Sequence, residues 1–413
     1  MKVIVIGGGV IGYCSAYYLQ KSGHEVTILE KSDASISPSY WNAGMIVPSH
    51  FIPLASPGVI AKGIKWMLSS SSPFHIKPRF DKDLVQWLWE FYKHSNSSHV
   101  NSSTVLLKDM NQLSNLLFQE IIEENNFNIN KKDGLLMVFN TEKGKKEEIE
   151  TAEKATELGI QAEILNNDAL SSLEPNITYR AKGAIHYPGD AFMSPSNFMH
   201  SLEMSLINNG VNILKNQKVT GFEQATNLVS SVQTEKEAFQ CDKIVLASGI
   251  HSFSLGKLLG LYIPMQGGKG YSITVPQPKR LPSICSILTE ANVAVTPMNG
   301  DLRLAGTMEI AGMNIDINRS RVNGFLSSVV KYMPDYDFEN LRSQKVWVGL
   351  RPCTPDGLPF LGVSDQIKNL VVCTGHAMMG FSMGPVSGKL VSELINETDT
   401  TIMIEKLHPD RYL

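Results

Sequence analysis

The chain has 413 residues, of which 43% are hydrophobic and 19% charged, and its formal net charge at pH 7 is −3. This length favours two joined domains over a single core, and the nearly balanced charge gives no electrostatic reason to expect nucleic acid as a partner. The five cysteines include no Cys-x-x-Cys pair, which argues against a disulfide framework or a structural zinc site and favours a reducing compartment.

The amino terminus, MKVIVIGGG, differs from a signal peptide because glycines interrupt its apolar run early. No apolar run approaches the length that spans a bilayer. We therefore expect a soluble, cytoplasmic protein without a bound metal, with peripheral contact on the inner face of a membrane as the alternative.

The first thirty residues predict a strand, a glycine-rich turn, a helix and a second strand. Residues 3–6 are a continuous apolar run, which is typical of a strand buried on both faces. Gly7, Gly9 and Gly12 then form G-x-G-x-x-G, and a helical stretch follows through Leu19. This order is that of a dinucleotide-binding βαβ unit.

Each glycine of this motif has a separate role. Gly7 permits the tight turn, Gly9 lets the backbone approach a pyrophosphate, and Gly12 lets the helix pack closely on the strand. The helix start offers free N–H groups and a positive dipole end to phosphate. Glu30, 18 residues after the last glycine, is placed to accept hydrogen bonds from an adenosine ribose. A glycine-rich turn in an unrelated α/β domain is the alternative.

Later segments favour FAD over NAD as the cofactor. CDKIVLASGIHS predicts a buried strand that runs into Ser248 and Gly249, and the preceding GVNILKNQKVTGFEQ predicts a strand pair that brings Val219 near the adenine. Residues 370–373 predict another strand, followed by a glycine-rich bend and a helix from about Pro385. A helix N-terminus aimed at the flavin N1–C2=O edge would stabilise the anion formed on reduction, which a nicotinamide does not require.

The middle of the chain predicts helices followed by antiparallel strands. Residues 83–125 predict helix, whereas the Ser/Asn-rich stretches 69–72 and 95–103 predict short surface connections. KGYSITV and DLRLAGTMEI have strand-like content, and residues 297–301 supply a hairpin-type turn.

Several stretches carry a family resemblance that runs almost end to end. They are the glycine-rich fingerprint, NAGMIVPSHFIPLASPGVIAKGIKWML, KGYSITVP, RLAGTMEIAG, VGLRPCTPDGLPFLG and GHAMMGFSMGPVSG. Together they resemble the D-amino-acid oxidase and glycine oxidase superfamily, and within it the bacterial D-amino-acid dehydrogenases. The resemblance implies an α/β fold (α+β overall) with an interrupted Rossmann-type FAD-binding domain and a substrate domain with a mixed, largely antiparallel sheet.

The resemblance also implies how the chain is divided. The FAD-binding domain would comprise residues 1–50, 155–260 and 345–413, and the substrate-binding domain residues 51–154 and 261–344. The residues expected to contact FAD are Gly7, Gly9, Val10, Ile11, Gly12, Glu30, Lys31, Asn42, Ala43, Gly44, Met45, Ile46, Val219, Ser248, Gly249, Gly375, His376, Met378, Met379 and Gly380. In the sarcosine-oxidase branch a cysteine holds flavin covalently; Gly349 stands at that position here, so we expect non-covalent FAD.

Arg351 is the leading substrate-binding candidate. It lies in VWVGLRPCTPDGLPFLG with no acidic residue adjacent, and Pro352 and Pro355 stiffen the backbone around it. In the superfamily that the chain resembles, the arginine of this element holds the substrate's α-carboxylate, which a guanidinium grips through two parallel hydrogen bonds. A structural arginine paired with a distant carboxylate is the alternative.

Three further residues are weaker candidates for the substrate site. Tyr271 is expected to add a hydroxyl to the carboxylate or to line the pocket, with a packed core position as the alternative. His50 is expected to face the substrate, with a surface position as the alternative. His376, in TGHAMMG, is expected to have a structural or electrostatic role beside the flavin.

The resemblance implies the reaction as well. Hydride would pass from Cα of a D-amino acid to flavin N5, giving an imino acid and then a 2-oxo acid and ammonia, with a quinone or another acceptor taking the electrons. Alternatives are a D-proline or cis-4-hydroxy-D-proline dehydrogenase, a glycine- or sarcosine-type oxidase producing hydrogen peroxide, and a flavin-binding subunit of a larger electron-transfer complex. PGVIAKGIKWMLSS and DLVQWLWEFYKHS are amphipathic, so they suit either a membrane surface or packing on the core.

Overall fold

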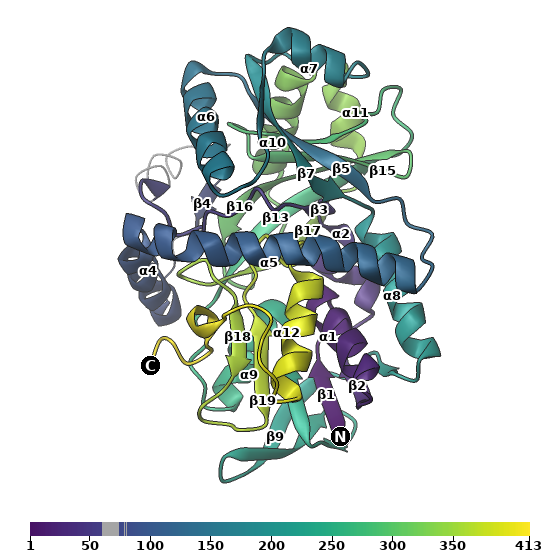
Figure 1. Cartoon of the computed structure of the whole chain (residues 1–413), viewed down its shortest axis with the longest axis vertical. Coiled ribbons are helices and arrows are strands. Elements are labelled where there is room, and N and C mark those ends of the chain that lie inside the picture. Colours follow the sequence, from purple (N-terminus) through teal and green to yellow (C-terminus); the bar gives the residue numbers. More distant parts are fainter. Residues whose placement is uncertain (60–73, 78, 80) are drawn as a thin grey trace.

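The computed structural model describes residues 1–59, 74–77, 79 and 81–413. Its strands form a six-stranded sheet (sheet A), a ten-stranded sheet (sheet B) and a three-stranded sheet. Sheet A and its helices occupy the lower half of Figure 1, and sheet B the upper half, with helix α5 (Ser97–Glu124) crossing between them.

Sheet A is built around the first strand of the chain. Its order is β18-β19-β12-β1-β2-β8, and all neighbours are parallel except β18 and β19. Its strands are β1 (Lys2–Ile6), β2 (Glu25–Leu29), β8 (Asn212–Leu214), β12 (Lys243–Leu246), β18 (Phe360–Val363) and β19 (Leu370–Thr374). Residues 3–6 are buried on both faces, which confirms the strand expected from their apolar run.

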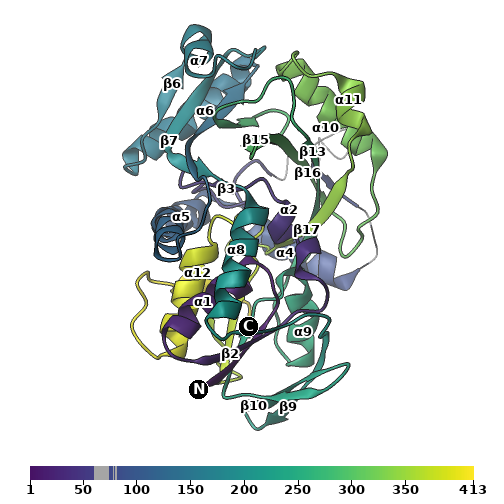
Figure 2. The ribbon, with the colours of Figure 1, turned by 90° about the vertical axis from the view of Figure 1, so that its right-hand side faces the viewer.

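Helices cover one face of sheet A, and Figure 2 shows them stacked beside each other. They are α1 (Val10–Lys21), α8 (Pro195–Asn208), α12 (Gly384–Ile395) and α5. In this core the rings of Phe118, Phe198 and Phe381 meet with centroids 4.9 to 5.8 Å apart. α12 begins within one residue of the expected Pro385, so the late strand–bend–helix unit is confirmed.

The opposite face of sheet A carries the three-stranded sheet. Its strands are β9 (Val219–Ala225), β10 (Leu228–Thr234) and β11 (Ala238–Gln240). Val229 and Val232 of β10 pack with Ile4 and Ile6 of β1. The expectation that β8 and β9 pair with each other is wrong: β8 extends sheet A beside β2, and β9 pairs with β10. The partner of β8 is distant in sequence, which a local pattern does not specify.

Sheet B is curled and largely antiparallel, with the order β17-β13-β16-β15-β14-β5-β7-β3 and with β4 beside β16 and β6 beside β7. Its strands are β3 (Met45–Ile46), β4 (Phe74–Ile76), β5 (Lys132–Phe139), β6 (Glu163–Leu165), β7 (Gly183–Phe192), β13 (Gln266–Val275), β14 (Cys285–Leu288), β15 (Val293–Met298), β16 (Asp301–Ile310) and β17 (Trp347–Cys353). Helix α10 (Arg319–Tyr332) packs on it. The two kinds of sheet confirm the expected fold class.

Other described helical segments connect these layers. They are η1 (Ala34–Ile36), α2 (Pro38–Trp41), α4 (Lys82–His94), α6 (Glu142–Glu157), α7 (Asn167–Leu173), η2 (Gly249–His251), α9 (Ser252–Leu258), α11 (Phe338–Ser343) and η3 (Glu405–Leu407).

Two local expectations have different outcomes. The hairpin turn between β15 and β16 is confirmed, with Asn299 and Gly300 at φ of 53° and 92°. The surface connection expected at residues 95–103 is wrong, because most of this stretch forms the first turns of α5. Asn96 caps that helix by accepting a hydrogen bond from His99 N, so its side chain starts the helix. The stretch 69–72 lies outside the described residues.

The expected domain boundaries do not separate the two large sheets. β3, β7 and β17 lie within the ranges expected for the FAD-binding domain, yet they belong to sheet B. α5 lies within a range expected for the substrate domain, yet it packs with α1 and α12. Elements of each range thus cross to the other sheet, and the division into domains stays a prediction.

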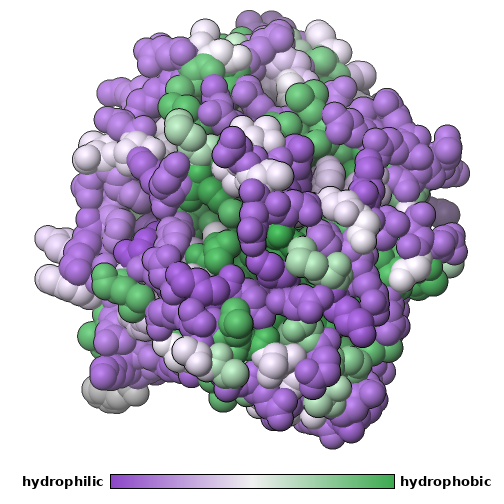
Figure 3. Space-filling view, turned by 60° about the horizontal axis from the view of Figure 1, so that its bottom comes forward, coloured by the Kyte–Doolittle hydropathy of each residue, from purple (hydrophilic) through white to green (hydrophobic). Residues whose placement is uncertain are grey.

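The surface shows both hydrophilic and apolar areas. Seen from the end that carries β1 and β9, it is mostly hydrophilic, with apolar side chains gathered near the middle of the face (Figure 3). No helix in the described part of the chain is long and apolar enough to cross a membrane. Helix α4 packs one side on the core and turns the other outward: its buried residues are Leu84, Trp87 and Phe91, and its exposed apolar residues are Val85, Trp89 and Tyr92. Most of the other amphipathic stretch, 57–70, lies outside the described residues.

Candidate active site

The glycine-rich turn lies at the carboxyl end of β1 and leads directly into α1. Gly7 has a φ of +116°, and a Cβ added to it would stand 2.6 Å from the carbonyl oxygen of Ala247 at the end of β12. A Cβ on Gly12 would overlap the carbonyl oxygen of Gly7. The first turn of α1 therefore packs on β1 and β12 more closely than any side chain at these positions would allow.

The acidic end of β2 faces this turn. Glu30 is buried and accepts a hydrogen bond from Gly8 N at 2.9 Å, while its other oxygen accepts bonds from Ser32 N and Oγ. Ser39 Oγ accepts a bond of 2.9 Å from Val10 N at the start of α1. Gly8 and Ser39 were not among the expected cofactor residues; the run of three glycines was the only sequence signal for the first.

The end of β12 completes the same edge of sheet A. Gly249 has a φ of +55°, and a Cβ there would meet no atom within 4 Å. Lys31 Nζ lies 2.5 Å from His251 Nε2, so the segments after β2 and β12 touch. Val219 is buried among the apolar residues between sheet A and the three-stranded sheet. Small residues thus gather where β1, β2 and β12 end, which is where parallel sheets bind nucleotides.

The loop from Asn42 joins this edge to sheet B. Asn42 Oδ1 accepts a bond of 2.7 Å from Gly44 N, and Gly44 O accepts one of 2.9 Å from Met193 N. Met45 and Ile46 then form β3 at the edge of sheet B. Arg303 donates to Asn42 O at 3.2 Å, and its guanidinium stands 5.3 Å from the centroid of the Trp41 ring.

Arg303 is a residue that sequence reasoning missed. It is buried on β16 and donates from Nε to Thr274 Oγ1 at 2.8 Å. Burial lowers its pKa to about 10. A strand arginine two residues from a turn carries no local signal of this contact, because the loop it holds is more than 250 residues away in sequence.

The late glycine-rich bend is hydrogen-bonded to the strand that carries Arg351. His376 forms a bridge with Cys353, and Ala377 N donates to Pro352 O at 3.0 Å. The His376 ring lies 2.9 Å from Ser387 Oγ of α12, and burial lowers its pKa to about 3, so the ring is neutral at physiological pH. Within the bend, Met378 is exposed and a Cβ on Gly380 would meet only the Cβ of His376 within 4 Å.

Arg351 lies near the end of β17 and is half-buried. Its Nη1 donates to the carbonyl oxygen of Thr307 at 2.9 Å, and burial lowers its pKa. The guanidinium forms no ion pair with any carboxylate in the described part of the chain. The alternative of a structural arginine paired with a distant carboxylate is therefore not what these residues show. A half-buried cation with one carbonyl partner is incompletely satisfied and suits an incoming anion.

The hydroxyl of Tyr271 has hydrogen-bond partners within the core. Its hydroxyl donates to Glu309 Oε1 at 2.6 Å and accepts from Asn318 N at 3.0 Å. The side chain is 1% exposed, and burial raises its pKa. The packed position weighed as an alternative describes this tyrosine better than a free hydroxyl in the pocket.

His50 belongs to a buried polar group that also includes Ser49 and Asp190. Ser49 donates from N and Oγ to the two oxygens of Asp190 at 3.0 and 2.5 Å, and Ser49 Oγ lies 3.2 Å from His50 Nδ1. Burial raises the pKa of Asp190 to about 7 and lowers that of His50 to about 4. Asp190 was not a sequence candidate, because nothing in GAIHYPGDAF marks its carboxyl as buried.

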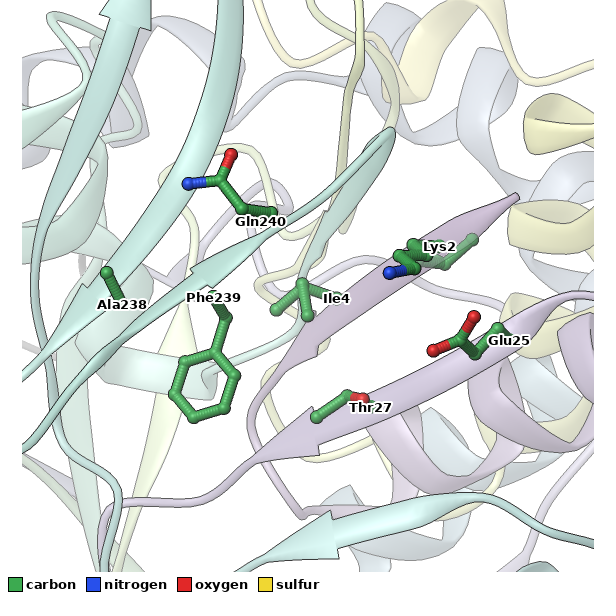
Figure 4. Close-up of a pocket in the computed structure, with 8 residues that line it drawn as sticks. Lys2, Ile4, Glu25, Thr27, Ala238, Phe239 and Gln240 are labelled. Atoms are coloured by element: carbon green, nitrogen blue, oxygen red, sulfur yellow. The ribbon is translucent and has the colours of Figure 1, made fainter.

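One surface hollow lies elsewhere on sheet A. Figure 4 shows Phe239 of β11 beside Ile4 of β1 and Thr27 of β2, and Gln240 of β11 lines the hollow as well. Lys2, at the start of β1, also lines it. This hollow is at the amino ends of β1 and β2, whereas the glycine-rich turn is at their carboxyl ends. The hollow is therefore separate from the edge of sheet A at which β1, β2 and β12 end.

Comparisons with known proteins agree with this geometry. A family model described as FAD-dependent oxidoreductase matches residues 2–394. A curated relative from Helicobacter pylori, D-amino acid dehydrogenase, is 30% identical over 408 residues, which cover 98% of each chain. Glycine oxidase from Geobacillus kaustophilus superposes with a TM-score of 0.80 at 22% identity, covering 100% of this chain and 98% of the other.

A further solved structure was determined with FAD bound. L-α-glycerophosphate oxidase from Mycoplasma pneumoniae superposes with a TM-score of 0.73 at 18% identity, covering 97% of this chain and 96% of the other. At these identities the two solved structures support the fold alone.

Proposed function

The chain belongs to the family of FAD-dependent oxidoreductases, and on this premise we propose that it is a D-amino-acid dehydrogenase acting on the Cα–N bond of its substrate. FAD is its cofactor. The support for the finer assignment is the 30% identity, over almost the whole chain, to a relative named D-amino acid dehydrogenase. A quinone or another redox partner would take the electrons.

The residues at the carboxyl ends of β1, β2 and β12 fit FAD. A Cβ on Gly249 would meet no atom within 4 Å, the start of α1 offers a positive dipole end to a pyrophosphate, and Glu30 has oxygens placed for a ribose. Binding would be non-covalent, since Gly349 has no side chain and burial raises the pKa of the Cys353 thiol to about 11. When bound, FAD supplies the acceptor for the hydride that leaves Cα.

The single observation that carries the proposal is the hydrogen bonding of the Arg351 guanidinium. Its guanidinium has a carbonyl partner and no carboxylate partner among the described residues, and it lies two residues before the bridge to His376. An α-carboxylate would complete its hydrogen bonding and offset the cost of burying the charge. The substrate class that we propose is therefore a small acid whose carboxylate is held by Arg351.

The surrounding residues would hold that acid in one position. Hydrogen bonds from Ala377 N to Pro352 O and between Cys353 and His376 tie the Arg351 strand to the glycine-rich bend. Because both are parts of one hydrogen-bonded unit, the distance from the carboxylate to the flavin-binding bend is constrained. Such positioning contributes a large part of the rate in reactions where the cofactor supplies the chemistry.

The test is anaerobic reduction of the FAD-loaded protein, followed by its visible spectrum. We expect D-amino acids to bleach the flavin band and their L-enantiomers to leave it unchanged. Arg351→Ala should lower kcat/KM by about 30-fold or more, because one partner of a desolvated charge pair is lost. The matched control is Arg342→Ala, which removes an arginine that is 55% exposed. A flavin that no amino acid bleaches would refute the proposal.

A glycine- or sarcosine-type oxidase is the second candidate, because glycine and sarcosine also carry a carboxylate that Arg351 could hold. Glycine and sarcosine would then reduce the flavin, and hydrogen peroxide would form stoichiometrically in air. Reduction of a dye without peroxide supports the dehydrogenase. Including D-proline and cis-4-hydroxy-D-proline in the substrate series distinguishes a cyclic imino acid from a linear substrate.

A further inference from the structure

The pairing of β13 with β16 slips beside Arg351. Lys269 pairs with Glu309, but Tyr271 pairs with Gly306, so the single residue Gly270 faces two residues of β16. Thr307 lies in this bulge with a φ of +66°. A β-branched residue rarely adopts the left-handed region, and bulges of this kind redirect the backbone next to functional sites.

The bulge and the residue opposite it both touch the Arg351 side chain. Thr307 directs its carbonyl oxygen at Arg351 Nη1, 2.9 Å away. On β13, a Cβ added to Gly270 would stand 2.5 Å from Arg351 Nη2 and 2.6 Å from Cζ. The guanidinium thus occupies the space that a side chain at position 270 would fill.

The bulge is held from the other face of the sheet. Glu309, two residues after Thr307, accepts a hydrogen bond from Tyr271 and lies 3.5 Å from Lys269 Nζ and 3.6 Å from Arg321 Nε. Glu309 is 4% exposed, so these contacts are shielded from water. This buried group gives Tyr271 a place behind the substrate site rather than in it.

We infer that Thr307 and Gly270 form a cradle that aims the Arg351 guanidinium at the substrate carboxylate, and that both are positioning residues of the reaction. The inference rests on the proposed function for the identity of the acid. The carbonyl oxygen of Thr307 accepts a hydrogen bond from one N–H of the guanidinium. The absence of a side chain at Gly270 lets the guanidinium lie against the strand. The remaining N–H groups are then left to grip a carboxylate.

Gly270→Ala tests the cradle with one methyl group. The atoms that the methyl would overlap belong to the end of the flexible Arg351 side chain, so the strand can remain while the guanidinium moves. A displacement of about 1 Å lowers rates by up to about 100-fold. We expect kcat/KM for D-alanine to fall about 10- to 100-fold. Affinity for benzoate, measured from the flavin spectrum, should fall similarly, while affinity for the neutral benzamide stays unchanged.

The control variant is Gly189→Ala, at an exposed strand glycine where a Cβ meets no atom within 4 Å. The decisive comparison is with Arg351→Ala: if Gly270 acts through the arginine, adding Gly270→Ala to Arg351→Ala should change benzoate affinity less than about 2-fold. An equal loss in both backgrounds would overturn the cradle. Unchanged benzoate affinity in Gly270→Ala alone would also overturn it.

Thr307→Gly gives an independent test if Gly270→Ala does not fold. Glycine adopts this φ freely and adds no atoms, so the bulge loosens and benzoate affinity should fall about 3- to 10-fold; an unchanged affinity would overturn the inference. Failure of the proposed function looks different. The two outcomes can be separated in the wild-type protein and in Gly270→Ala. If no amino acid reduces the wild-type flavin, the proposed function is refuted. If benzoate still binds the wild-type protein better than benzamide does, and Gly270→Ala weakens benzoate binding, the cradle is nevertheless supported. If the wild-type protein does not bind benzoate better than benzamide, both the proposed function and the cradle are refuted.

Discussion

Replacing Asp190 by Asn should stabilise the protein above neutral pH. The carboxyl is fully buried, and its partners are Ser49 N and Oγ. Burial raises its pKa from 3.8 to about 7, which corresponds to about 4 kcal/mol between the two protonation states. Because the folded pKa is raised, the folded state holds its proton between about pH 4 and 7 while the unfolded state releases it. Stability is therefore lost as pH rises through this window.

The asparagine can satisfy the same partners. Its Oδ1 can accept from Ser49 N, and its Nδ2 can donate to Ser49 Oγ, whose proton then turns toward His50 Nδ1, 3.2 Å away. The variant thus avoids the buried charge without leaving a polar atom unpaired. At pH 8 we expect a gain of about 2–4 kcal/mol. With an unfolding entropy of about 0.9 kcal/mol/K for a chain of this length, Tm should rise by about 2–4 °C.

Thermal unfolding of the FAD-loaded protein from pH 4.5 to 8.5 is the assay. The variant minus wild-type difference in Tm should grow between pH 4.5 and 7 and then level off. Both proteins also lose stability toward acid, because His50 and His376 have lowered pKa values and remain neutral when folded; the contribution of His376 is the same in both and cancels in the difference. Asp399→Asn, at an exposed position, is the control. A difference that is independent of pH, or a less stable variant at pH 8, would refute the reasoning.

Two other substitutions have defined outcomes. Gly12→Ala should yield a colourless protein that FAD does not reconstitute, because the new Cβ overlaps the carbonyl oxygen of Gly7; Gly189→Ala should keep its FAD. Tyr271→Phe should lower the free energy of unfolding by about 1–3 kcal/mol, because Asn318 N loses its acceptor and Glu309 its donor, as denaturant titration would show. Loss of benzoate binding without loss of stability in this variant would instead return Tyr271 to the substrate site.

Local patterns were sufficient for the nucleotide-binding part of the fold. The apolar run at residues 3–6 and the G-x-G-x-x-G turn identify β1 and α1, because a strand buried on both faces and a turn that excludes side chains leave direct marks in the sequence. The Asn299–Gly300 turn is readable for the same reason, since both residues tolerate a positive φ. Sheet membership was less accessible: β8 and β9 are adjacent in sequence but lie in different sheets.

The candidate site divides in the same way. The sequence alone identified Arg351 as a cation among stiffening residues and, through the family resemblance, assigned it a carboxylate. Only the tertiary structure decided what surrounds it: the Thr307 carbonyl from β16, the space above Gly270, and the hydrogen bond that holds Tyr271 to Glu309. The same is true of Asp190, whose raised pKa comes from burial. Burial and cross-strand contacts depend on segments far apart in the chain, so no short stretch of sequence specifies them.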